Sequence, residues 1–166
     1  MSSTMGSIFL MQFPGLNEQK IYSEKTLSSN LLTLKKNKCT TIVSLLEADE
    51  ISKFCEISFF SNTIRSLGLD WHHLPIIDRD TPDKEFLLNW EMLSSKLRQD
   101  LKSGFNICLH CLAGLGRSGT IAALMLIDHG DKQKDAILKV REHRNGAIEN
   151  EKQENFVKNY QSMASK

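Results

Sequence analysis

The sequence predicts an α/β fold in which a mostly parallel β-sheet is covered on both faces by helices. Two observations carry this prediction. Short β-rich segments alternate along the chain with longer segments of helical periodicity, and this alternation is typical of parallel sheets whose strands are joined by helices. Residues 105–110, with the sequence FNICLH, also have the continuous apolar character of a central strand.

The amino-terminal third of the chain contains two predicted strands and one predicted helix. Residues 7–13 (SIFLMQF) are mostly apolar and predict a strand. Residues 26–38 (TLSSNLLTLKKNK) predict a helix, because three leucines recur at helical spacing. Residues 40–46 (TTIVSLL) are rich in β-forming residues and bounded by charged ones, which predicts a buried strand. The three leucines are Leu27, Leu31 and Leu34.

The middle of the chain contains two further helices and a strand. Residues 59–68 fit a short helix that ends at a glycine, and residues 70–76 (DWHHLPI) fit a strand. A polar stretch then leads into a helix over residues 82–104, with Thr81 as its predicted cap and Pro82 at its first position. The apolar face of this helix consists of Phe86, Trp90, Leu93, Leu97 and Leu101.

The carboxyl-terminal part is predicted to be mainly helical. After the central strand at 105–110 and a glycine-rich turn, residues 118–130 (SGTIAALMLIDHG) are apolar nearly all round, which predicts a buried helix. Residues 132–144 and 150–164 predict two amphipathic helices that complete the chain.

Length and composition indicate one globular domain, residues 1–166. The net charge of +1 provides no general attraction to nucleic acid or anionic lipid. No apolar stretch reaches the length needed to cross a membrane. The amino terminus lacks the basic start of a signal peptide, and four cysteines are few for a chain of this size. We therefore expect a cytoplasmic protein that is a monomer and binds neither nucleic acid nor membranes.

The turn HCLAGLGRSG, residues 110–119, is the strongest functional signal. It lies between the predicted central strand and the buried helix, where backbone N–H groups at a helix amino terminus attract an anion. Gly114 and Gly116 allow the backbone to curl into an anion-binding nest. The same field favours the thiolate form of Cys111 at its base. The alternative is a buried structural cysteine in a glycine turn.

Two further side chains of this turn suit phosphate chemistry. Arg117 supplies a planar fork that binds two oxygens of an oxyanion. Ser118 can donate a hydrogen bond to the sulfur and stabilise it as a leaving group. Together with Cys111 they meet the requirements for attack of sulfur on a phosphate monoester through a covalent thiophosphate.

The run HCLAGLGRSGT resembles the phosphate-binding loop of the cysteine-dependent protein tyrosine and dual-specificity phosphatases, His-Cys-x5-Arg-Ser/Thr. Its Ala-Gly-Leu-Gly-Arg core is similar to several branches, including the regenerating-liver and kinase-associated phosphatases. Residues 72–83 (HHLPIIDRDTPD) resemble the general-acid loop of the kinase-associated branch, and residues 145–157 (NGAIENEKQENFV) the segment after its core. The resemblance covers about residues 40–160 and implies the phosphatase fold.

The resemblance also implies roles for individual residues. Cys111 is the expected nucleophile, with Arg117 and Ser118 as catalytic partners. His110 is expected to order the loop and tune the thiol. The loop residues expected to bind the substrate phosphate are Leu112, Ala113, Gly114, Leu115, Gly116 and Arg117. The covalent mechanism needs no metal and no other cofactor. Cys108 is expected in the core, although it or Cys55 remains a candidate to capture an oxidised Cys111 as a disulfide.

Protonation of the leaving group requires an acid, and a carboxyl group on a mobile loop is the usual source. Three aspartates lie in the matching segment. Asp83 falls in the first turn of a predicted helix, where an acidic residue is simply stabilising. Asp78 directly follows an apolar strand end and is favoured over Asp80. The alternative is that all three are solvated loop acids.

The chain departs from the family pattern after the core. Phosphotyrosine-specific members carry two glutamines there, the first of which positions the hydrolytic water, whereas the matched positions here are Glu149 and Gln153. We expect Glu149 to point away from a bound phosphate and Gln153 to take the water, with solvent exposure of both as the alternative. The Lys-Asn-Arg-Tyr motif of those members is also absent, which favours a shallower site.

These observations predict a protein phosphatase that hydrolyses phosphotyrosine through a cysteinyl-phosphate intermediate, with phosphoserine and phosphothreonine as further candidate substrates. One alternative is a phosphoinositide or RNA 5′-phosphatase with the same loop. It is disfavoured because the five residues between Cys111 and Arg117 include no lysine. A phospho-binding module without turnover is the second alternative, and the intact set of catalytic residue types argues against it.

Overall fold

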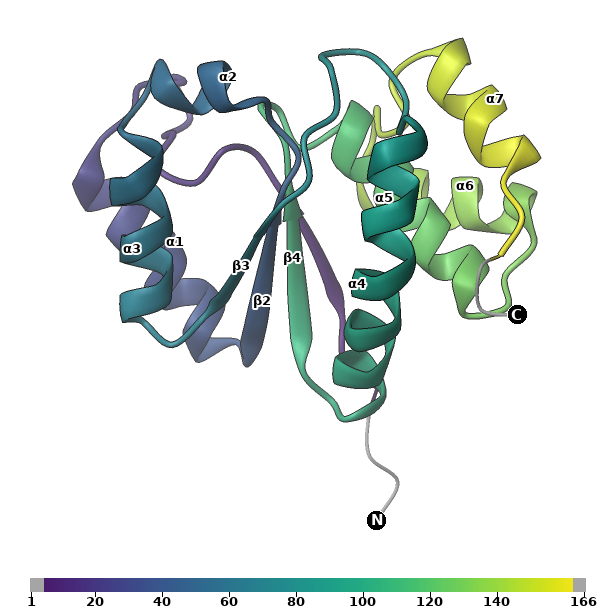
Figure 1. Cartoon of the computed structure of the whole chain (residues 1–166), viewed down its shortest axis with the longest axis horizontal. Helices are drawn as coiled ribbons and strands as arrows, with labels where there is room; N and C mark the ends of the chain where they lie inside the picture. The colour runs from purple at the N-terminus through teal and green to yellow at the C-terminus, as the bar shows by residue number, and fades with distance from the viewer. Residues whose placement is uncertain (1–4, 163–166) are drawn as a thin grey trace.

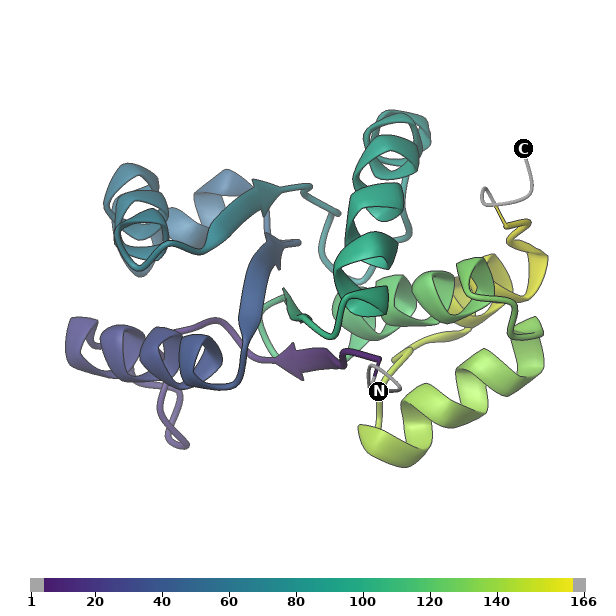
Figure 2. The same ribbon diagram turned by 90° about the horizontal axis from the view of Figure 1, so that it is seen from below.

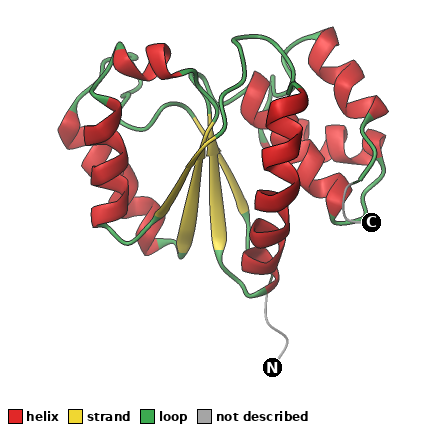
Figure 3. Ribbon diagram, in the orientation of Figure 1, coloured by secondary structure: helices red, strands yellow, loops and turns green. Residues whose placement is uncertain are grey.

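The computed structural model describes residues 5–162 and contains a four-stranded parallel β-sheet. The strand order is β1-β4-β2-β3, and each neighbouring pair is parallel (Figure 3). The strands are β1 (Ile8–Met11), β2 (Cys39–Ser44), β3 (Asp70–His73) and β4 (Asn106–His110). The α/β fold with a parallel sheet is confirmed, and so is the central place of the strand at 105–110.

Helices cover both faces of this sheet. Helices α1 and α3 pack on one face, while α4 and α5 lie on the other, with α6 and α7 beyond α5 (Figures 1 and 2). The helices are α1 (Glu24–Lys36), α2 (Ala48–Ser52), α3 (Ile57–Ser66), α4 (Lys84–Lys102), α5 (Gly116–Asp128), α6 (Gln133–His143) and α7 (Glu151–Asn159). None of the helices in residues 5–162 has the length and apolar character needed to cross a membrane.

The predicted apolar faces form the core. The three leucines of α1 and the five apolar residues predicted for α4 are all buried, as the helical spacing requires. Helix α5 is buried on nearly every side because it lies between the sheet and the pair α6 and α7. Its amino terminus is thereby fixed directly after β4, which is the arrangement that the turn at 110–119 needs.

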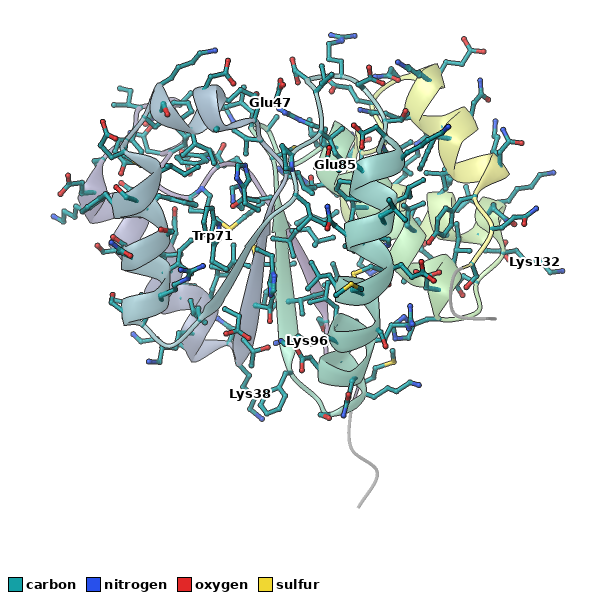
Figure 4. The ribbon with its side chains drawn as sticks, viewed as in Figure 1. Lys38, Glu47, Trp71, Glu85, Lys96 and Lys132 are labelled. Atoms are coloured by element: carbon teal, nitrogen blue, oxygen red, sulfur yellow. The ribbon has the colours of Figure 1, made fainter. Side chains whose placement is uncertain are left out.

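Parallel strands end at the same edge of a sheet, so the segments after β2, β3 and β4 meet there. Helix α2 follows β2, the loop at 74–83 follows β3, and the turn at 111–115 follows β4. Figure 1 shows these segments along the upper edge of the sheet, and Figure 4 places Glu47 in the same region. Sequence segments up to 70 residues apart therefore surround one site.

Three details differ from the sequence-based expectation. Helix α4 begins at Lys84, and Asp83 caps it by accepting a hydrogen bond from Phe86 N–H at 2.7 Å. Thr81 does not cap the helix, because its hydroxyl faces the Asp80 carboxylate at 3.4 Å instead. The short helix α2 was not predicted. Of the last predicted helix, residues 163 and 164 lie outside the described residues.

Candidate active site

The sulfur of Cys111 lies at the base of the turn after β4. The side chain is buried, and the N–H of Gly114 donates a hydrogen bond to Sγ at 3.3 Å. Ser118 Oγ lies 3.4 Å from the same sulfur, within the first turn of α5. The predicted contacts of the thiol with the curled backbone and the serine hydroxyl are therefore present.

Gly114 is required by the shape of this turn. It has a φ of +72°, and a Cβ atom built on it would lie 2.4 Å from the carbonyl carbon of Met11. The contact with the β1 backbone leaves no room for a side chain, and the left-handed conformation also favours glycine. The end of β1 therefore supports the turn from outside.

The Arg117 guanidinium is buried at the centre of the site, with 3% of its side chain exposed. Its two terminal nitrogens donate to the Glu50 carboxylate of α2 at 2.6 and 2.9 Å. One of them also donates to the carbonyl oxygen of Ile76 at 3.0 Å. This bidentate geometry fixes the plane of the guanidinium group.

Burial and ion pairing act in opposite directions on this pair. Burial by itself raises the pKa of Glu50, but the hydrogen bonds from Arg117 and from the Glu47 N–H hold it below its usual value. For Arg117, burial by itself lowers the pKa, and the Glu50 carboxylate raises it overall. Both groups therefore remain charged. The sequence analysis did not identify Glu50. The sequence signal that could have located it is the Glu-x-x-Glu capping box at the start of α2.

We expect Glu50→Gln to reduce the free energy of unfolding by about 1.5–3 kcal/mol at neutral pH, because one charged hydrogen-bond acceptor is lost. Because the pKa of Glu50 is lowered in the folded state, its contribution is present above the ordinary carboxyl pKa and disappears as the pH falls through the lowered value. The difference between the variant and the wild type should therefore shrink in acid. Denaturant titrations at several pH values measure it. Glu47→Gln, in the same capping box, is the control and should show a smaller loss. A constant difference at every pH would contradict this assignment.

The three aspartates of the loop after β3 have different surroundings. Asp78 Oδ1 lies 3.1 Å from a terminal nitrogen of Arg117, and 62% of the Asp78 side chain is exposed. Asp80 accepts from Lys152 Nζ at 2.5 Å and from the Thr81 N–H at 2.6 Å. The hydrogen bond from Lys152 lowers the pKa of Asp80 below its usual value. The loop therefore brings Asp78 into the site and directs Asp80 to α7.

The start of α7 holds this loop. The side-chain amide of Asn150 donates to the Arg79 carbonyl at 2.9 Å, and that of Gln153 donates to the Asp80 carbonyl at 3.2 Å. Arg79 has a φ of +59°, a conformation that non-glycine residues rarely adopt. The two amides bond the carbonyl groups of this unusual residue and of the next one, and thus support the turn that follows Asp78.

The two positions matched to glutamines have different surroundings. Gln153 is completely buried, and its Oε1 accepts from the Glu149 N–H at 3.0 Å. Solvent exposure is therefore wrong for Gln153, whose amide bridges two loops. Glu149 is exposed, as the alternative expected, and its Oε2 lies 2.9 Å from the position that a Cβ of Gly116 would occupy. A side chain at Gly116 would also come within 2.9 Å of Gln153 Oε1, so the ends of both side chains would have to shift.

His110 lies beneath the turn and is fully buried. Its Nε2 is 2.5 Å from Ser44 Oγ, and that oxygen also accepts a hydrogen bond from Trp71 Nε1 at 2.8 Å. Burial lowers the pKa of His110 to about 3, so the imidazole is neutral near pH 7. Trp71 lies on the α3 side of β3, where it packs against Phe60 (Figure 4). The residue before the thiol is thus held by Ser44 of β2, whose hydroxyl is held in turn by Trp71 of β3.

The combined arrangement can bind a tetrahedral oxyanion beside a thiol. Backbone N–H groups and the guanidinium of Arg117 provide positive potential, and a carboxyl group lies at the opening. The fold fixes the orientation of these N–H groups and of the helix amino terminus, and fixed donors are the requirement for stabilising developing negative charge.

Comparisons with known proteins agree with this geometry. A family model described as "Polymorphic toxin system, DSP-PTPase phosphatase" matches residues 18–131. The "PRL-1 phosphatase" of Drosophila melanogaster is 31% identical, over 99% of this chain and 92% of its own length. The "Protein tyrosine phosphatase type IVA 3" of Mus musculus is 33% identical, over 83% of this chain and 73% of its own length.

A solved structure has the same fold. Kinase associated phosphatase, with its catalytic-site cysteine substituted by serine, superposes with a TM-score of 0.76 and 26% identity. The match covers 90% of this chain and 83% of that one.

Proposed function

This chain belongs to the protein tyrosine and dual-specificity phosphatase family and is a protein phosphatase, and we propose that it acts through a cysteinyl-phosphate intermediate on Cys111. The observation that supports this intermediate most directly is the buried sulfur of Cys111, which accepts the Gly114 N–H at 3.3 Å beneath the anion-binding turn. A thiolate so placed is the attacking group that the turn presents to a bound phosphate.

The proposed reaction has two steps. In the first, the sulfur forms a bond to phosphorus while the bond from phosphorus to the ester oxygen breaks. Asp78 donates its proton to that departing oxygen. In the second, water attacks phosphorus and gives a proton to the Asp78 carboxylate, the S–P bond breaks, and phosphate is released with the thiolate and the protonated Asp78 restored. Ser118, 3.4 Å from Sγ, stabilises the sulfur when it leaves.

Arg117 couples phosphate binding to the position of Asp78. Its terminal nitrogens contact Glu50 and Asp78, so a phosphate that binds along the edge formed by Nε and one terminal nitrogen takes the place of the Asp78 carboxylate. Such a replacement releases Asp78 toward the ester oxygen.

The surroundings of the turn suit a phosphorylated protein side chain. Ile77 and Leu112, which adjoin Asp78 and Cys111 in sequence, expose 62% and 39% of their surfaces. These apolar residues are suited to contact the ring of phosphotyrosine, while phosphoserine and phosphothreonine remain further candidates. The phosphoinositide and RNA alternatives are not favoured, because the curated relatives compared above carry the names of protein tyrosine phosphatases or a PRL phosphatase.

Asp78→Asn tests the proposed acid. We expect this variant to slow hydrolysis of phosphotyrosine by about 10²–10⁴-fold, the range for a positioned general acid. The effect should shrink for aryl phosphates whose leaving groups need no proton, and the alkaline limb of the pH–rate profile should disappear. Both effects are measured by steady-state kinetics on a series of aryl phosphates. Phosphotyrosine is the member of the series whose phenol is the poorest leaving group.

Asp80→Asn is the matched control. Asp80 is two positions after Asp78 in the same loop, but its carboxylate is paired with Lys152 of α7. This variant should change the rate far less. If Asp80→Asn were the severe variant and Asp78→Asn the mild one, the acid would be Asp80. If neither changed the rate on phosphotyrosine, the acid would lie outside this loop.

A further inference from the structure

We propose that Arg144, at the end of α6, is a positioning residue that holds the peptide groups of the phosphate-binding turn with their N–H groups facing inward. The inference deepens the proposed function, on which it rests, because it names a residue outside the Cys-x5-Arg turn that shapes the oxyanion site. It follows from the hydrogen bonds of the turn's carbonyl oxygens.

The Arg144 guanidinium bonds two successive carbonyl groups of the turn. One terminal nitrogen donates to the Ala113 oxygen and Nε donates to the Gly114 oxygen, both at 3.2 Å. In a trans peptide unit the C=O and the N–H of the next residue point in opposite directions. The N–H groups of Gly114 and Leu115 therefore point away from Arg144. The Gly114 N–H shows this directly, since it donates to the Cys111 sulfur at 3.3 Å.

The neighbouring carbonyl groups of the turn are also held from outside, but by backbone donors. The Leu112 oxygen accepts from the Phe13 N–H at 3.0 Å. The Leu115 oxygen accepts from the Gly119 N–H at 3.0 Å and from the Ile148 N–H at 3.3 Å. Four successive carbonyl groups thus face outward, and their partner N–H groups face inward. Arg144 contributes the side-chain donors in this set, so it is the component that substitution can remove.

The peptide groups that Arg144 holds are the ones most able to rotate. They lie on either side of Gly114, and a glycine permits backbone conformations that other residues resist. A rotation of the unit between Ala113 and Gly114 would direct a carbonyl oxygen at the thiolate and the bound phosphate. That oxygen would repel both. Two hydrogen bonds from one rigid fork oppose such a rotation.

Arg144 is itself fixed in place. Its backbone N–H donates to the Val140 oxygen at 2.9 Å, and its own carbonyl accepts from the Ala147 N–H at 3.0 Å. Its guanidinium contacts the outer side of the turn, whereas the sulfur lies on the inner side. Arg144 therefore acts through the backbone and is a positioning residue, while Arg117 is the arginine that contacts the phosphate in the proposed reaction.

Two variants test this inference in the Cys111→Ser background, which permits equilibrium binding without turnover. Arg144→Lys keeps the charge and loses the fork, and Arg144→Gln loses both. Calorimetric titration with vanadate should show affinity about 10- to 100-fold weaker in both variants, as for the loss of hydrogen bonds to a charged group. Lys134→Gln, which removes a charge from the first turn of α6, is the matched control and should bind vanadate as the parent does.

Two further measurements separate positioning from general stabilisation. The amide NMR signals of Gly114 and Leu115 should shift when vanadate binds to the parent and shift less in Arg144→Lys. With Cys111 intact, KM should rise while the dependence of the rate on the leaving group stays unchanged.

If Arg144→Lys bound vanadate with parental affinity and amide shifts, the inference would be overturned, because charge alone would then suffice. A wild-type protein, with Cys111 intact, that binds vanadate but fails to hydrolyse aryl phosphates would contradict the proposed function and leave the role of Arg144 intact.

Discussion

Cys111→Ser is expected to reduce hydrolysis of an aryl phosphate by about 10⁴- to 10⁶-fold, the range seen when a catalytic nucleophile is removed. A serine hydroxyl fits the space of the thiol, but it is far less acidic and does not supply an anion at neutral pH. The Gly114 N–H and the Arg117 guanidinium remain in place, so vanadate should still bind. Steady-state kinetics without added metal, paired with calorimetric titration, tests both statements.

Cys55→Ser is the matched control for this variant. Cys55 is a half-buried free thiol after α2, outside the turn that contains Cys111. It should retain wild-type turnover. The proposal of a cysteinyl-phosphate intermediate would be contradicted if Cys111→Ser retained hydrolysis that depends on an added metal. This holds whatever the variant's affinity for vanadate.

Arg117→Lys is expected to be nearly as damaging as Arg117→Ala, with a loss of kcat/KM on the order of 10³-fold. A lysine preserves the charge but presents a single nitrogen, so it cannot contact both Glu50 oxygens and two phosphate oxygens in one plane. In the wild type the two terminal nitrogens contact Glu50 at 2.6 and 2.9 Å, which leaves the edge containing Nε to face the phosphate.

Arg98→Lys provides the comparison for Arg117→Lys. Arg98 of α4 also pairs with a buried carboxylate, that of Asp128 in α5, at 3.5 Å and away from the turn. The Arg98 variant should affect thermal stability with little change in kcat/KM. If Arg117→Lys retained most of its activity, Arg117 would be acting as a point charge, and the planar model of phosphate binding would be wrong.

Much of the fold could be predicted because its signals are local. The leucine spacing in α1, the apolar stripe of α4 and the all-round apolar character of α5 each arise within one element. The predicted start of α4 was wrong, and the reason is also local. Thr81, Pro82 and Asp83 all suit a helix start, and the contact of Thr81 with Asp80 decided in favour of Asp83.

Some features of the candidate site could likewise be predicted from the sequence, and others could not. The amino-acid sequence by itself determined the turn at 110–119, since its cysteine, arginine and glycines are contiguous and lie between a central strand and a buried helix. It also determined that an acidic loop follows the third strand. These features need only the order of residues along the chain, because hydrogen bonding and conformational preference within a short turn depend on near neighbours.

Only the tertiary structure decided which residues support that turn. Glu50 reaches Arg117 across 67 positions, Arg144 reaches Ala113 across 31, and Gln153 reaches Asp80 across 73. Each of these side chains could equally have been a solvated residue on a helix surface. Their roles arise because parallel strands place separate loops at one edge of the sheet, where the packing of α2, α6 and α7 determines which polar groups meet.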